Sequence, residues 1–70
     1  MTDKHGNRLR VGGLLVNELN PLSSAKIISR QYVGFFYGYQ IKLQIKMNGK
    51  FVRIEHLSES ELESSNWVKK

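Results

Sequence analysis

The sequence contains no cysteine and only one proline among its 70 residues. A chain without cysteine forms neither disulfide bonds nor thiolate metal sites, which argues against a small secreted scaffold. No apolar run approaches the ~20 residues of a membrane-spanning helix, and the polar opening Met1–Gly6 does not resemble a signal peptide. We therefore expect a cytoplasmic protein without membrane contact. The length predicts a single domain over residues 1–70, with residues 1–8 as a flexible tail.

Acidic residues are also scarce, since six Asp and Glu stand against eleven Lys and Arg, which gives a net charge of +5. The charge is unevenly spread. Nine Lys and Arg precede Glu55, with only Asp3 and Glu18 among them, whereas residues 55–63 hold four Glu and no Lys or Arg. A basic body of this kind is a hint about partners. It fits contact with nucleic acid, and equally the ordinary solvation of a small domain.

The clearest local pattern is the unbroken alternation of apolar and polar residues over 39–47, which predicts a half-buried strand. Asn48-Gly49 follows directly and favours a two-residue type I′ hairpin turn. Residues 51–57 would return as the partner strand. In the register of such a turn, the facing pairs are Met47–Lys50, Ile45–Val52 and Leu43–Ile54 on the inner face, and Lys46–Phe51, Gln44–Arg53 and Lys42–Glu55 on the outer face, with His56 opposite Ile41.

The rest of the chain predicts shorter elements. Residues 14–19 and 25–33 are strand candidates, and residues 66–68 could form a short last strand. Ser58 and Glu61 have the spacing of a capping box, which predicts one helical turn with Leu62 directed inward. The sequence leaves open whether the first strand pairs with the last and so closes a barrel.

The opening Asp3-Lys4-His5-Gly6-Asn7-Arg8-Leu9-Arg10-Val11-Gly12 resembles the start of small bacterial and phage SH3-like modules. In the KOW-type and PhnA-type domains among them, this segment typically reads Asp-x-x-Gly-Asn-x-Leu-x-x-Gly, and Trp67-Val68-Lys69-Lys70 is similar to PhnA-type ends. The chain departs from the KOW pattern because it lacks a glycine and small-residue signature ahead of the second strand. The resemblance implies an all-β, small SH3-like barrel of about five short strands with one short helical turn near the C-terminus. It implies no particular function, because such barrels serve nucleic acids, proteins and enzyme subunits alike.

Catalytic and metal-binding patterns are weak. Nucleophilic catalysis needs an activated nucleophile beside a base, whereas the only histidines are His5 and His56, far apart in the sequence. Val11-Gly12-Gly13-Leu14 lacks the lysine and the spacing of a phosphate loop. We therefore expect no enzyme activity, no cofactor and no metal site.

Two patterns instead favour a binding module. The predicted hairpin combines basic residues with Phe51, as in a ribbon that grips phosphates and stacks on a base, although lysines on an outer face also serve solubility. The nucleic-acid-binding candidates are Lys42, Lys46, Lys50, Phe51 and Arg53, supported by Arg30 and Tyr37. The alternative is an accessory or regulatory protein, of phage type or homodimeric, that docks on another protein through Phe35, Phe36, Tyr37 and Trp67. Since neighbours alternate faces in a strand, at least one ring of residues 35–37 should be exposed.

Overall fold

The computed structural model describes all 70 residues. They form one antiparallel sheet and one short helix, preceded by an opening segment. The elements are β1 (Leu14–Asn17), β2 (Ser23–Gly34), β3 (Gly38–Met47), β4 (Lys50–Ser58), α1 (Glu59–Ser64) and β5 (Trp67–Lys69). The expected all-β fold of five strands with one short helix near the C-terminus is therefore confirmed. The sheet is not closed into a barrel, because its strand order is β4-β3-β2-β1-β5 and β4 and β5 form its two edges.

The first strand does pair with the last. Leu15 of β1 faces Lys69 of β5, and Val16 faces Val68, in antiparallel register. This pairing settles the alternative that the sequence left open. It does not close the sheet, because β4 pairs with β3 alone.

The β3–β4 hairpin turns at Asn48-Gly49, as the sequence predicts. Both residues have positive φ, 54° and 79°, which a type I′ turn requires at its two central positions. The first expected pairs are present, since Lys46 faces Phe51 and Met47 faces Lys50. Beyond them the register shifts by one residue, because Val52 has no partner on β3 and Arg53 faces Ile45.

This bulge overturns the rest of the predicted register. Gln44 faces Ile54, Leu43 faces Glu55, Lys42 faces His56 and Ile41 faces Leu57, so the expected pairs Ile45–Val52, Leu43–Ile54, Gln44–Arg53, Lys42–Glu55 and Ile41–His56 are wrong. The physical reason is that a bulge sets two residues against one, so every later residue of the strand changes faces. Leu57, rather than His56, consequently packs against the core.

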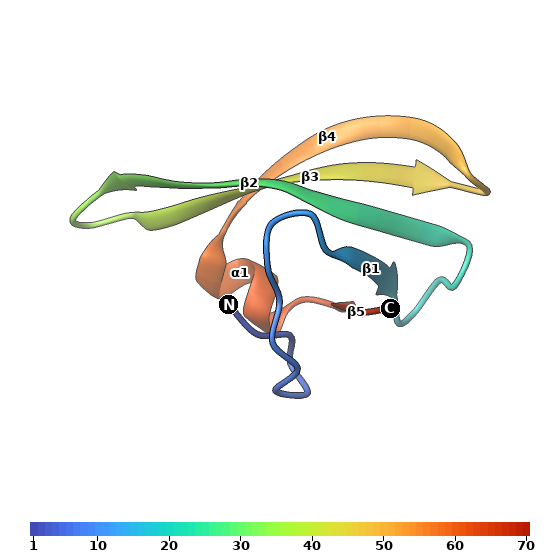
Figure 1. The fold of residues 1–70 in the computed structure, drawn as a ribbon, viewed down its shortest axis with the longest axis horizontal. Helices are drawn as coiled ribbons and strands as arrows, with labels where there is room; N and C mark the ends of the chain where they lie inside the picture. The colour runs from blue at the N-terminus through green and yellow to red at the C-terminus, as the bar shows by residue number, and fades with distance from the viewer.

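The core lies on one face of the sheet. Its nine buried side chains are those of Leu9, Leu15, Ala25, Ile27, Ile41, Leu43, Ile45, Leu62 and Trp67. We call this the core face, and α1 and the opening segment lie on the same side of β2, β3 and β4 (Figure 1). The outer face carries the alternate residues of these strands, which no helix covers (Figure 1).

Helix α1 begins with the predicted capping box. The Ser58 hydroxyl accepts a hydrogen bond from the Glu61 backbone N–H at 3.1 Å, and the Glu61 carboxylate accepts one from the Ser58 N–H at 2.9 Å. These bonds hold the pKa of Glu61 below its usual range. Leu62 is fully buried, so the helix closes the core beneath β3 as expected.

The opening segment is not the free tail that we expected over residues 1–8. Thr2 forms a β-bridge with Arg8, and the Leu9 N–H donates to the Met1 carbonyl. Asp3 is buried, and its carboxylate accepts hydrogen bonds from the backbone N–H groups of His5, Asn7 and Lys69 and from the Asn7 side chain. These donors satisfy the carboxylate and tie the segment to the end of β5.

Candidate nucleic-acid interface

Most of the positive charge in this structure has no carboxylate partner. Only Lys4, Arg30 and Arg53 among the eleven Lys and Arg lie within ion-pair distance of a carboxylate. The other eight are Arg8, Arg10, Lys26, Lys42, Lys46, Lys50, Lys69 and Lys70. The net charge of +5 is therefore concentrated on side chains that are free to meet an external anion.

The acidic side chains, in contrast, are all engaged. Glu18 binds Lys4 and His5, Glu59 binds Arg30 and the N-terminus, and Glu55 binds Arg53. Hydrogen bonds from Lys4 and His5 lower the pKa of Glu18. The pKa of Glu59 is also lowered, chiefly by its hydrogen bonds from Arg30. Glu61 caps α1, and Glu63 accepts a hydrogen bond from the Thr2 N–H. None of these carboxylates neutralises the free cations.

The outer face of the sheet gathers three of the free lysines. Lys42 and Lys46 alternate along β3 with the buried core residues, so their side chains leave the sheet on the opposite side. Lys26 of β2 faces Gln44 between them. We refer to Lys26, Lys42 and Lys46 as the lysine face.

A shallow hollow opens beside these lysines. Its volume is about 200 Å³, and its lining includes Lys26 and Lys46 together with Ser24, Gln44 and Lys70. We call it the outer hollow. Its lining provides three ammonium groups and two neutral polar side chains and includes no Asp or Glu side chain.

Aromatic and aliphatic surface borders the lysine face on β4. Phe51 faces Lys46 and Ile54 faces Gln44, and their exposed fractions are 58% and 38%. An exposed ring next to free cations is the combination that proteins use to stack bases while they hold the phosphate backbone. Phe51 and Lys46 thus form the part of the predicted ribbon that the structure keeps together.

The other predicted residues of the ribbon lie elsewhere. Because of the bulge, Arg53 faces Ile45 on the core-face side, where it pairs with Glu55 at 3.1 Å. Lys50 is unpaired and lies opposite Met47 at the end of the hairpin. The structure therefore divides the five candidates of the ribbon between the two faces of the sheet.

Arg30 is committed to contacts within the protein. Its Nε donates to the Glu59 carboxylate at 2.8 Å, and its guanidinium lies over the Tyr39 ring at 3.6 Å from the centroid. The hydrogen bond to Glu59 raises the pKa of Arg30. This cation is less available to an external anion than the lysines of the outer face.

The β2–β3 hairpin carries a second exposed surface. Phe35, Phe36 and Tyr37 are 86%, 90% and 76% exposed, so all three rings are exposed where the sequence required at least one. They occupy the turn that projects from the body at one end of the molecule (Figure 1). Trp67, predicted with them as a docking residue, is buried in the core and does not belong to this surface.

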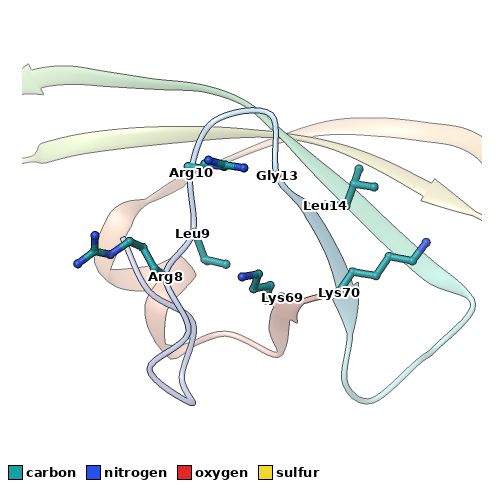
Figure 2. Close-up of a pocket in the computed structure, with 7 residues that line it drawn as sticks. All are labelled: Arg8, Leu9, Arg10, Gly13, Leu14, Lys69 and Lys70. Atoms are coloured by element: carbon teal, nitrogen blue, oxygen red, sulfur yellow. The ribbon is translucent and has the colours of Figure 1, made fainter.

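The largest hollow in the structure involves residues that sequence reasoning missed. A pocket of about 530 Å³ is lined by Arg8, Leu9, Arg10, Gly13, Leu14, Lys69 and Lys70, and we call it the basic pocket (Figure 2). The only local signals were the two arginines at alternate positions and the terminal pair of lysines. Their convergence depends on the pairing of the two ends of the chain, which no local pattern reveals.

The structure brings no three His, Asp or Glu side chains together as metal ligands. His5 contacts Glu18, and His56 is exposed on the outer face of β4 opposite Lys42. No helix is long and apolar enough to cross a membrane. The candidate site therefore consists of unpaired lysines and arginines, the outer hollow, the basic pocket and exposed aromatic rings.

Comparisons with protein-family models, with curated proteins and with solved structures find no match to this chain.

Proposed function

We propose that this protein is a non-catalytic module that binds nucleic acid with low sequence specificity through the outer face of its β2–β3–β4 sheet. The observation that carries the proposal is the lysine face beside Phe51, where three lysines without a carboxylate partner border an exposed ring. The binding residues are Lys26, Lys42, Lys46 and Phe51. Lys50 lies opposite Met47, on the other side of the hairpin from Lys46, and is not one of them.

The chemistry of these groups supports affinity without sequence readout. Lysine ammonium groups neutralise phosphates and release counterions, a contribution that does not depend on base identity. A phenylalanine ring stacks on any base, because every base offers a π-face. The other polar residues of this surface are Ser24 and Gln44 in the outer hollow and Ser29 and His56 beside Lys42, too few to read a defined series of base edges.

Salt-dependent titration of oligonucleotides tests this function. Single-stranded DNA and RNA are titrated at about 50 mM and about 200 mM salt, and affinity should fall as salt rises. The variant Lys42→Gln/Lys46→Gln should bind more weakly and with a smaller salt dependence. Absence of binding at the lower salt, or an affinity that salt does not change, would refute the proposal.

The exposed tip of the β2–β3 hairpin favours a second candidate function, protein docking. Three nearly fully exposed aromatic side chains in sequence are unusual on a surface that faces only water. The partner in this case is a second copy of the chain, which offers the same tip. Sedimentation of the wild type and of Phe35→Ser/Phe36→Ser distinguishes the cases, because a dimer that the variant dissociates supports docking and a wild-type monomer at every concentration contradicts it.

A further inference from the structure

The basic pocket lies between two segments that backbone hydrogen bonds hold in place. On one side, the loop of residues 8–13 is fixed to β2, because the Gly12 N–H donates to the Ile27 carbonyl at 2.7 Å and the Ile27 N–H donates to the Gly13 carbonyl at 3.0 Å. On the other side, the Lys70 N–H donates to the Leu14 carbonyl at 3.1 Å. The pocket is therefore shaped by the fold itself, and a ligand would not have to order its walls.

The loop reaches this shape through a close turn. Gly12 has a φ of +89°, in the left-handed region, and a Cβ added to Gly13 would lie 2.9 Å from the Arg10 carbonyl oxygen. The Gly13 N–H donates to that same carbonyl at 2.9 Å. The two glycines thus allow the tight turn that sets Arg10 at the pocket beside β1.

The charged side chains of the pocket all have one sign. Four of its seven lining residues are cationic, none of the four has a carboxylate partner, and no Asp or Glu lines the pocket. Asp3 binds the Lys69 backbone from within the protein, but hydrogen bonds from N–H groups occupy both of its carboxylate oxygens. Figure 2 shows Arg10 and Lys69 on the loop side of β1, whereas Lys70 extends across β1 to its other side and Arg8 is directed away from the pocket.

The basic pocket adjoins the outer hollow. Leu14 and Lys70 line both, so the cations form one tract from Lys46 and Lys26, past Lys70, to Lys69 and Arg10. The tract passes from the outer face of the sheet to the space between the loop and β5. An extended polyanion on the lysine face would meet the basic pocket next along the surface.

We infer that the basic pocket is a second phosphate-binding site for the same nucleic acid, and that this ligand is single-stranded. The inference rests on the proposed function. A duplex is stiff over about 150 base pairs, whereas the whole protein measures 37 × 24 × 18 Å. A flexible single strand can follow the tract around β1 from the outer hollow into the pocket, and a straight duplex can lie on only one of the two surfaces.

Two matched double variants separate the two sites. Arg10→Gln/Lys69→Gln removes two free cations from the basic pocket, and Lys42→Gln/Lys46→Gln removes two from the lysine face. All four side chains lack ion pairs, so both variants should fold, which circular dichroism checks. Each is titrated with oligothymidylates of about 4 and about 16 nucleotides, the range of single-strand site sizes in small β-domains, and with a duplex of the longer sequence.

With the longer single strand, both variants should bind more weakly, and the slope of log K against log salt should shrink by about 0.7 for each phosphate that the variant no longer neutralises. With the shorter strand, and with the duplex, only the lysine-face variant should differ from the wild type.

If the pocket variant binds the longer strand as tightly as the wild type while the lysine-face variant binds it more weakly, the inference is wrong and the proposed function stands. If the pocket variant weakens duplex binding as much as single-strand binding, the ligand is not selected as single-stranded. If the wild type binds none of the three, both the inference and the proposed function fail.

Discussion

The carboxylate of Asp3 accepts a hydrogen bond of 2.9 Å from the backbone N–H of Lys69, which joins two residues that are 66 positions apart in the sequence. The same carboxylate accepts three more hydrogen bonds from His5 and Asn7. This one side chain thus holds the opening loop to the last strand. It also positions the backbone of a residue that lines the basic pocket.

Asp3→Asn should destabilise the protein in a pH-dependent way. The Lys69 N–H bond, with those from Asn7 and His5, holds the pKa of Asp3 far below its usual range. A carboxyl group whose pKa is depressed on folding stabilises the folded state above the ordinary Asp pKa of about 4, and this contribution is lost as the pH falls toward the folded-state pKa. Thermal unfolding should show a lower Tm for the variant at pH 7, with a difference that shrinks progressively below about pH 4.

Glu18→Gln is the control for this experiment. Its carboxylate is bonded at the surface to Lys4 and His5 rather than to the backbone. Its substitution should lower the Tm less at neutral pH, because surface ion pairs contribute little to stability. A Tm difference for Asp3→Asn that stays constant down to acidic pH would show that the ionised carboxylate is not what stabilises the fold.

The bulge at Val52 predicts losses of different size for two residues that an unbroken register would pair. Leu43 is fully buried, whereas Ile54 is 38% exposed on the outer face. Leu43→Ala should therefore lower the free energy of unfolding by about 2–5 kcal/mol, and Ile54→Ala by about 1 kcal/mol or less. Urea unfolding measures both free energies of unfolding. Equal losses would contradict the bulge and support the unbroken register, in which the two residues face each other.

These two residues show how far the sequence could predict the fold. The alternation over 39–47 and the Asn48-Gly49 turn correctly placed the hairpin, because both signals are local. The bulge was missed because the residues that favour it lie beyond the alternating segment. Only a register shifted by one residue directs Leu57 to the core, at the point where Ser58 begins α1. In β2, a similar register shift leaves Ile28 without a partner on β3. This shift explains why apolar and polar residues alternate poorly along β2.

The candidate site was predictable only in part, for the same reason. Lys42, Lys46 and Phe51 share the outer face because they lie close to the turn, where the expected register holds. Arg53 changed faces with the bulge, and Arg30 is engaged by Glu59, a residue 29 positions away. The basic pocket joins residues 8–14 to residues 69–70, a long-range arrangement that composition and periodicity do not encode.

Ser58→Ala should weaken the junction between β4 and α1. The hydroxyl accepts the Glu61 N–H, and the reciprocal bond from the Ser58 N–H completes the capping box. Loss of an N-cap hydroxyl costs about 0.5–2 kcal/mol, and a six-residue helix has little stability of its own to offset it. Chemical denaturation should show this loss for Ser58→Ala and almost none for Ser29→Ala, whose side chain forms no hydrogen bond within the protein. Equal effects for the two serines would mean that the cap does not stabilise the helix.

Phe51 and Lys46, which face each other across the hairpin, should affect oligonucleotide binding in different ways if the proposed function holds. Phe51→Ala removes a stacking surface worth about 1–3 kcal/mol per base, so affinity should fall while the salt dependence stays the same. Lys46→Ala removes a phosphate contact, so affinity should fall together with the slope of log K against log salt, by about 0.7 for single strands. Titration of a single-stranded oligonucleotide over a range of salt concentrations separates the two effects.

Phe36→Ala is the matched control, because its ring is also exposed, at the distant hairpin tip, and should leave both the affinity and its salt dependence unchanged. A loss for Phe36→Ala as large as that for Phe51→Ala would move the stacking site from the lysine face to the tip of the β2–β3 hairpin.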